Sequence, residues 1–213
     1  MKSSKYFVAV AVIAVIGTFI LFKHNYKNAE AEKTPEVKTT ELIKEHNPRL
    51  GPDTAEVKIV EFLDPECEAC SAMAPIVKQL MKEYDGKVQL IVRYMPFHGN
   101  SMMAATYLEE AREKGKYWES LSALFENLPA WGDHHAPKPE LIPKFLVSAG
   151  VSDAASFEEN VLLSKHRWKV DADFADGKML GVTQTPTFFV NGKKLEDIGY
   201  EPIKQAIENE LKK

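Results

Sequence analysis

Hydrophobic runs alternate with amphipathic segments along most of this chain, and this pattern predicts a mixed α/β domain. Residues 57–63 are almost continuously hydrophobic and rich in β-branched side chains, as expected of a buried strand. Residues 67–84 repeat hydrophobic positions at helical spacing, and residues 88–94 alternate as a second strand. A strand, a helix and a strand in this order predict a parallel βαβ unit with a right-handed crossover.

The centre of the chain is predicted to be helical. Helical spacing or capping signals are found over residues 100–114, 117–127, 141–149, 154–163 and 165–180. In the last of these helices Trp168, Ala172, Ala175 and Met179 share one side. A hydrophobic stripe of this kind is expected to face the core.

The C-terminal part returns to β structure. Residues 187–190 and 193–196 are expected to pair as a hairpin, because Asn191-Gly192 between them is a strong turn signal. A final helix is expected from Pro202. The predicted order is therefore βαβ, a helical block and ββα.

The first residues follow a different pattern, because a hydrophobic run over residues 6–22 comes directly after two lysines. A helix of this length spans about 26 Å, slightly less than a hydrocarbon core of about 30 Å. We interpret residues 1–22 as an uncleaved membrane anchor with its lysines in the cytoplasm. A cleaved signal segment is the alternative, since residues 29–31 resemble a cleavage site. Both interpretations export the rest of the chain.

Composition is ordinary for a folded domain after this segment. Residues 23–47 are polar and are interpreted as a flexible stalk, which leaves residues 48–213 as one domain with its own core. The whole chain is 45% hydrophobic and 27% charged, which is typical of globular proteins. A formal net charge of -4 without a basic cluster argues against a nucleic-acid partner.

Both cysteines of the chain, Cys67 and Cys70, lie where the first strand gives way to the first helix. A disulfide across so short a loop constrains the unfolded chain little, so redox chemistry explains the pair better than stabilisation does. The free N–H groups and the dipole of a helix start lower a cysteine pKa to between about 3.5 and 7.5. We expect Cys67 to attack and Cys70 to resolve the mixed disulfide.

Two other uses of a Cys-x-x-Cys pair stay open, a zinc site and an inert structural disulfide. Zinc requires further ligands, and the sequence has no third cysteine. His134-His135 is the only other ligand-like pair, and it lies in a proline-rich loop. We therefore expect neither a metal nor a cofactor.

Several segments together resemble the DsbA-like branch of the thioredoxin superfamily, from about Pro48 to the C-terminus. The resemblance implies a thioredoxin-like α/β fold, with a helical insertion at about residues 100–180 between a βαβ half and a C-terminal ββα half. It also implies thiol-disulfide oxidoreductase activity. The segments that carry it are Val60-Glu61-Phe62, Asp64-Pro65-Glu66-Cys67, Pro75, Arg93-Tyr94, Pro96-Phe97-His98-Gly99-Asn100, Gly115-Lys116-Tyr117-Trp118 and Val182-Thr183-Gln184-Thr185-Pro186-Thr187.

The resemblance also implies roles for single residues. It implies that Thr185–Pro186 is a cis peptide beside the cysteines, where the Thr185 backbone pairs with a substrate strand. Glu61 shares a strand face with hydrophobic residues, so burial is expected to raise its pKa. The family's acid at the matching position relays protons to the second cysteine. Glu68 and Ala69 are expected to contact substrate. A trans proline and a solvent-facing Glu61 are the alternatives.

The residues between the cysteines depart from the family pattern. Strongly oxidising members carry Pro-His there, whereas this chain carries Glu68 and Ala69. With Asp64 and Glu66 nearby, Glu68 is expected to disfavour a thiolate at Cys67. We therefore expect a Cys67 pKa in the upper part of the helix-start range, lowered by Glu68→Gln. The direction of the reaction stays open.

The function indicated is exchange of the Cys67–Cys70 disulfide with cysteines of exported proteins, with disulfide formation favoured. The alternatives are an anchored thiol reductase for one client and a non-enzymatic metal-binding or chaperone-like module. We expect a single-pass protein of a bacterial cytoplasmic membrane, with its domain facing the periplasm or the exterior, or a soluble periplasmic protein after signal cleavage. A membrane redox partner should recycle the cysteines. A monomer is expected, because the stalk is too short for a dimerisation domain.

Overall fold

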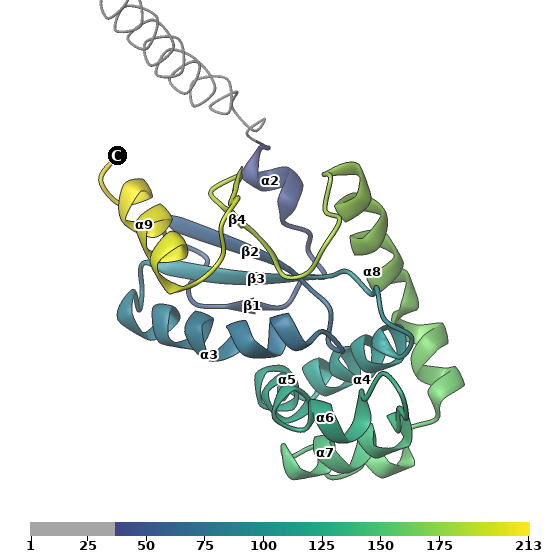
Figure 1. Ribbon diagram of the computed structural model, residues 1–213. Coiled ribbons are helices and arrows are strands. Elements are labelled where there is room, and N and C mark those ends of the chain that lie inside the picture. Colours follow the sequence, from purple (N-terminus) through teal and green to yellow (C-terminus); the bar gives the residue numbers. More distant parts are fainter. Residues whose placement is uncertain (1–36) are drawn as a thin grey trace, which may run out of the picture. The chain divides into compact units, whose positions relative to one another are not determined.

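In the computed structural model, which describes residues 37–213, the strands form one mixed sheet (Figure 1). Its strand order is β1-β3-β2-β4-β5. Strands β2 (Val57–Leu63) and β3 (Val88–Tyr94) are parallel, and β4 (Thr187–Val190) runs antiparallel to β2. Short strands β1 (Arg49–Leu50) and β5 (Lys193–Lys194) form the two edges.

The predicted strands and turn are confirmed, with two differences at the edges. Asn191 and Gly192 have φ values of 45° and 88°, the left-handed conformation that a tight hairpin requires. Strand β5 is shorter than predicted. Strand β1 was not predicted, because two exposed residues carry no hydrophobic alternation, and pairing with β3 alone defines it.

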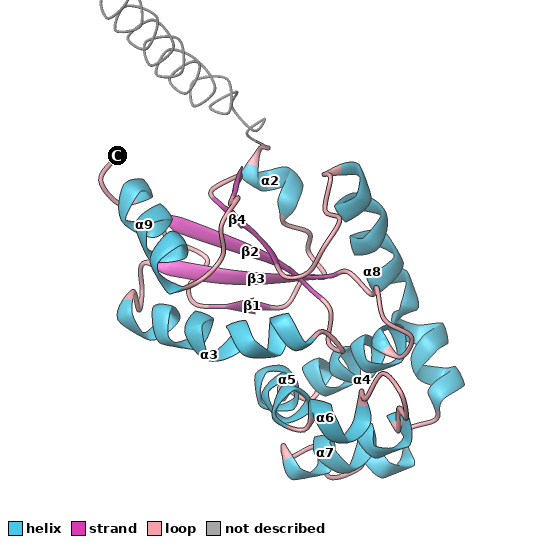
Figure 2. Ribbon diagram, in the orientation of Figure 1, coloured by secondary structure: helices cyan, strands magenta, loops and turns pink. Residues whose placement is uncertain are grey.

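Helices cover both faces of the sheet and form a separate group at one end (Figures 1 and 2). One face packs against α3 (Glu68–Glu83) and α9 (Tyr200–Glu210). The other packs against α2 (Thr39–Leu42) and the C-terminal half of α8 (Glu159–Met179). The separate group comprises α4 (Ser101–Glu113), α5 (Tyr117–Glu126), α6 (Leu128–Trp131), α7 (Ile142–Ser148) and the short 3-10 helices η1 (Pro139–Leu141) and η2 (Ala154–Ser156).

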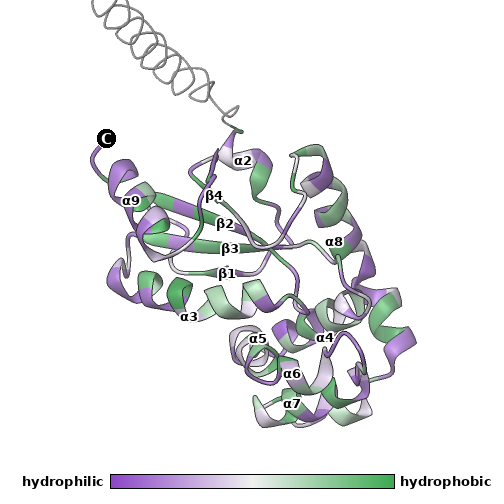
Figure 3. Cartoon of the chain, viewed as in Figure 1, coloured by the Kyte–Doolittle hydropathy of each residue, from purple (hydrophilic) through white to green (hydrophobic). Residues whose placement is uncertain are grey.

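Helix α8 differs most from its prediction. The two helices expected over residues 154–163 and 165–180 are replaced by the 3-10 turn and by one helix that begins at Glu159. The predicted core stripe is wrong, because Trp168 is 57% exposed and Met179 is 79% exposed. Figure 3 shows hydrophilic and hydrophobic residues mixed along α8. Its buried positions are Leu162, His166, Lys169, Val170, Asp173 and Gly177.

The folded unit begins earlier than the predicted boundary at Pro48. Leu42 is fully buried, the Val37 N–H donates to Gly192 O at 3.0 Å, and Asn47 Nδ2 donates to Asp173 Oδ1 at 3.1 Å. Residues 37–47, whose polarity predicts a stalk, therefore belong to the fold through the burial of Leu42 and through polar contacts. The anchor expected over residues 1–22 lies outside the described residues. Over residues 37–213, no helix is long and apolar enough to cross a membrane.

Candidate active site

The two cysteines lie at the N-terminal end of α3, as predicted. Cys67 is the N-cap residue and has extended backbone angles, and Cys70 lies in the first turn. Cys67 is 8% exposed, whereas Cys70 is fully buried, and both thiols are free. Only the sulfur of Cys67 is therefore open to a second sulfur from outside.

The environment of Cys67 favours its thiolate. The pKa of Cys67 is lowered to about 5, and the largest cause is a hydrogen bond from the Cys70 thiol. Burial acts in the opposite direction and raises this pKa. The Thr185 side chain and the backbone N–H groups of Cys70 and Ala69 lower this pKa further. These are donors of the kind that a helix start provides.

Glu61 on β2 is a buried acid whose charge acts on both cysteines. Glu61 is only 5% exposed. Burial raises the pKa of Glu61 to about 8, and the negative charge of Cys67 adds to this rise. The pKa of Cys70 is raised by burial, by its hydrogen bond to Cys67 and by the charge of Glu61. The structure thus brings together a buried thiol that resists deprotonation and an acid that titrates near neutral pH.

The loop before β4 closes the other side of the site. The Thr185–Pro186 peptide bond is cis, as the resemblance implied. The Cys67 thiol donates to Thr185 O at 3.4 Å, so this carbonyl lies next to the reactive sulfur. Pro186 has no N–H of its own. The loop therefore brings Thr185, 118 positions from Cys67 in the sequence, to the site that already holds Glu61, Cys67 and Cys70.

The acids around Cys67 are not among the main causes of its pKa. Asp64 and Glu66 are buried and accept hydrogen bonds from the loop that follows β3, including Phe97 N at 2.7 Å and Asn100 N at 2.6 Å. Glu68 points outward, and its Oε1 lies 3.0 Å from His134 Nε2. The expectation of a Cys67 pKa in the upper part of the range is therefore wrong.

Sequence reasoning assigned no role to His98 or to His134. His98 Nδ1 lies 2.7 Å from Asp64 Oδ2. A signal for this contact existed, because parallel β2 and β3 end together, with Leu63 opposite Tyr94. Segments that follow two neighbouring parallel strands leave the sheet at the same edge. His134 follows α6 and had no comparable signal.

A cavity of about 510 Å³ lies between α3 and α5 and reaches Glu61. The Glu61 carboxyl makes no hydrogen bond within residues 37–213. The cavity therefore offers this acid its contact with solvent. Its other linings are mostly hydrophobic and include Leu63, Val77, Met81, Leu90, Trp118, Leu121 and Phe125.

One group of metal-type ligands occurs in the described part of the chain, away from the cysteines. It consists of Glu110, Glu113 and His166. The Lys165 ammonium already contacts both carboxylates, at 2.8 Å from Glu110 Oε2 and as an ion pair with Glu113. A side chain of this protein therefore supplies the positive charge there.

Comparisons with known proteins agree with this geometry. Residues 44–209 match the family model described as Thioredoxin. The chain is 28% identical over 224 residues to a probable disulfide bond formation protein D of Bacillus cereus, and the match covers 100% of both. Oxidised BdbD from Bacillus subtilis has a TM-score of 0.66 and 28% identity, covering 79% of this chain and 94% of that one.

A different kind of relative matches only in part. The Na(+)/H(+) antiporter NhaA 3 of Salinispora tropica is 31% identical over 150 residues, which is 68% of this chain. The chain spans only 21% of the length of that antiporter. The likeness is therefore to one part of a longer protein.

Proposed function

Because the chain belongs to the thioredoxin family and is a DsbA-like thiol-disulfide oxidoreductase, we propose that it donates its Cys67–Cys70 disulfide to cysteine pairs of exported proteins. The observation that supports this direction is the Cys67 pKa of about 5. A stabilised thiolate favours the reduced form of the pair, so the disulfide form is a strong oxidant.

The reaction consists of two thiol-disulfide exchanges at Cys67. A substrate thiolate attacks the Cys67 sulfur, the Cys67–Cys70 bond breaks, and the electron pair passes to Cys70. A second substrate thiolate then attacks the substrate sulfur of the mixed disulfide, and Cys67 leaves as a thiolate. The substrate loses two electrons and two protons overall, and the enzyme pair becomes a dithiol.

Glu61 and the loop before β4 assist these steps. Glu61 holds a proton at neutral pH, gives it to Cys70 when Cys70 leaves, and takes it back when the pair is oxidised again. The cavity connects this carboxyl with solvent. The Thr185 backbone, next to the Cys67 sulfur, is placed to pair with an extended substrate segment. Glu68 and Ala69 flank the same opening.

We further propose that the enzyme acts outside the cytoplasm, held to a bacterial membrane by residues 1–22. The hydrophobic run of residues 6–22 after two lysines supports this proposal. A membrane protein that accepts electrons would reoxidise the Cys67–Cys70 dithiol. Protease treatment of intact spheroplasts that contain the full chain tests this topology, since an outward domain is degraded and an inward one is protected.

The equilibrium constant with glutathione tests the direction. We expect a reduction potential above about -200 mV, toward the value of about -120 mV that a strong oxidant has. A potential near about -270 mV would instead support the reductase for a single client. A protein that exchanges its disulfide with no dithiol would instead support the metal-binding or chaperone-like module.

A further inference from the structure

Two histidines contact the turn that carries Cys67, and neither belongs to the Cys-x-x-Cys segment. His98 Nδ1 lies 2.7 Å from Asp64 Oδ2, and its side chain is 28% exposed. His134 Nε2 lies 3.0 Å from Glu68 Oε1. The two rings lie next to each other, with their centroids 5.4 Å apart. Asp64 and Glu68, which bracket Cys67 in the sequence, are thus each paired with an imidazole.

The position of His98 relative to Cys67 is set by the same turn. The Cys67 N–H donates to Asp64 O at 3.1 Å, and Asp64 Oδ2 holds the His98 ring. Partial burial lowers the pKa of His98, but its hydrogen bond to Asp64 and the charges of Asp64, Cys67 and Glu66 together raise it above the ordinary value. The acids and the Cys67 thiolate thus favour the imidazolium form of His98.

We propose that His98 is a positioning residue that holds positive charge beside Cys67, and that His134 draws the Glu68 carboxylate away from it. The inference rests on the proposed function and deepens it, because it names the groups that keep the Cys67–Cys70 pair oxidising although acids surround it. Oppositely charged groups within about 4–6 Å favour the charged form of each other.

The role of His98 makes the site depend on pH. Asp64 and Glu66 face His98 from the turn before α3, Cys67 faces it from the helix start, and His134 faces it from the segment after α6. As the pH rises through the raised pKa of His98, the imidazolium is lost while the acids keep their charge. The Cys67 thiolate is then less favoured, and the pair becomes less oxidising.

The charge of His98 can be separated from its contribution to the loop. Asp64 Oδ2 also accepts the backbone N–H groups of Phe97 at 2.7 Å and of His98 itself at 3.1 Å. These two bonds hold the loop without the ring. His98→Asn keeps an amide donor near Asp64 and removes the positive charge, together with the ring contact to His134.

The test compares His98→Asn and His134→Gln with His135→Gln in the full chain. His135 is exposed, and its backbone N–H bonds Asp133 rather than the turn. Thiolate absorbance at 240 nm and the equilibrium constant with glutathione are measured against pH. We expect His98→Asn to raise the Cys67 pKa by about one unit and to shift the equilibrium about tenfold toward the oxidised enzyme, about 30 mV. His134→Gln should act in the same direction but less, and His135→Gln should match the wild type.

A measurement on the unmodified protein guards against variants that fail to fold. If His98 stabilises the thiolate, reduction must raise the His98 pKa in turn, because the coupling is reciprocal. Proton NMR of the ring in the oxidised and reduced proteins measures this difference. Equal His98 pKa values in both forms, or an unchanged Cys67 pKa in folded His98→Asn, overturn the inference. A wild-type Cys67 pKa near 8.5 overturns the proposed function instead.

Discussion

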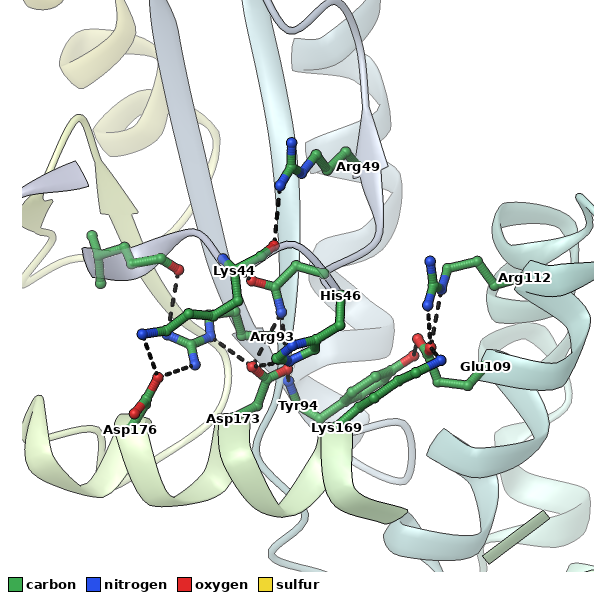
Figure 4. A network of polar contacts seen from close by, with 12 residues as sticks. Lys44, His46, Arg49, Arg93, Tyr94, Glu109, Arg112, Lys169, Asp173 and Asp176 are labelled. Carbon is green, nitrogen blue, oxygen red and sulfur yellow. Dashed lines mark hydrogen bonds and ion pairs between the residues drawn. The ribbon is translucent and has the colours of Figure 1, made fainter. Parts of the chain in front are cut away.

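Two buried carboxyl groups, Glu61 and Asp173, occupy regions of opposite character. Asp173 accepts hydrogen bonds from Arg93 Nε at 2.9 Å, from Asn47 Nδ2 at 3.1 Å and from Tyr94 N at 3.1 Å. His46 Nε2 lies 3.1 Å from the same carboxyl (Figure 4). Glu61 has no such partner within residues 37–213 and faces a cavity.

The difference separates an anchoring group from a reactive one. A fully bonded buried charge is costly to disturb, so Asp173 fixes α8 to β3 and to the segment before β1. An acid that lacks partners in a nonpolar setting prefers its neutral form and changes charge near neutral pH. The same chemical group therefore serves packing in one region and proton transfer in the other.

The largest effect should come from removing the bonded carboxylate. Asp173→Ala removes one of the two carboxylates that pair with the buried Arg93 guanidinium, which keeps only Asp176 at 2.7 Å, and it leaves the Tyr94 N–H without its acceptor. The free energy of unfolding should therefore fall by about 3–5 kcal/mol. Urea denaturation measures it. Asp171→Ala is the matched control on α8, because its pair with Arg167 is exposed, and it should cost less than about 1 kcal/mol. Equal losses would erase the contrast between the two sites.

The pH dependence of stability should expose Glu61 in the oxidised protein, where neither cysteine titrates. With Cys67 reduced the pKa of Glu61 is about 8, and in the oxidised protein, without the Cys67 charge, burial still raises it above the ordinary 4.5. The folded state therefore keeps a proton that the unfolded state has lost. This stabilisation is complete below pH 4.5 and is lost as the pH rises through the raised folded pKa, by up to about 1.4 kcal/mol per pH unit. Denaturation of the wild type and of Glu61→Gln at several pH values should show a steeper loss of stability above pH 4.5 in the wild type.

The rate of disulfide exchange should report proton transfer by the Glu61 carboxyl. Glu61→Gln cannot take the Cys70 proton, so resolution of a mixed disulfide by Cys70 should slow by about 10²-fold. Stopped-flow release of a fluorescent thiol from Cys67 reports this step. The initial attack by Cys67 serves as the internal control, since its thiolate is stabilised by other groups. Equal slowing of both steps would indicate a structural defect rather than lost proton transfer.

The smallest expected effect tests how much each partner of Asp173 contributes to stability. Asn47→Ala removes one donor to Asp173, together with the acceptor of the Lys44 N–H, and leaves the Arg93 bond in place. We expect a loss of about 1.5 kcal/mol, typical of one hydrogen bond to a charged group. Thermal unfolding of Asn47→Ala and Asp173→Ala, each against the wild type, gives the ratio of the two losses in stability. A loss as large as that of Asp173→Ala would mean that Asn47, rather than the charge pair, fixes the N-terminal segment.

Local patterns were enough to predict the elements that carry the chemistry. The run of residues 57–63 predicts β2, and the cysteine spacing after it places Cys67 at a helix start. The Asn191-Gly192 turn follows from two residues that tolerate a positive φ. Burial of Glu61 follows from its place on a hydrophobic strand face. Each of these inferences needs only neighbours in the sequence, and each is confirmed.

Contacts between distant segments decided the rest. Helix α8 was predicted to bury Trp168 and Met179, but it buries Lys169 and Asp173 because Glu109 and Arg93 lie opposite them. Lys169 Nζ donates to Glu109 Oε2 at 2.7 Å (Figure 4). A hydrophobic period counts apolar residues only and cannot register charges that another strand or helix will neutralise.

The same limit applies to the charge around Cys67. The sequence by itself determined that two sulfurs stand at a helix start, with acids at positions 64, 66 and 68. Only the tertiary structure decided that loop N–H groups bind two of these acids and that His134 pairs with the third. Electrostatic effects depend on distance in space, and the partners of these acids come from segments about 30 to 70 positions away.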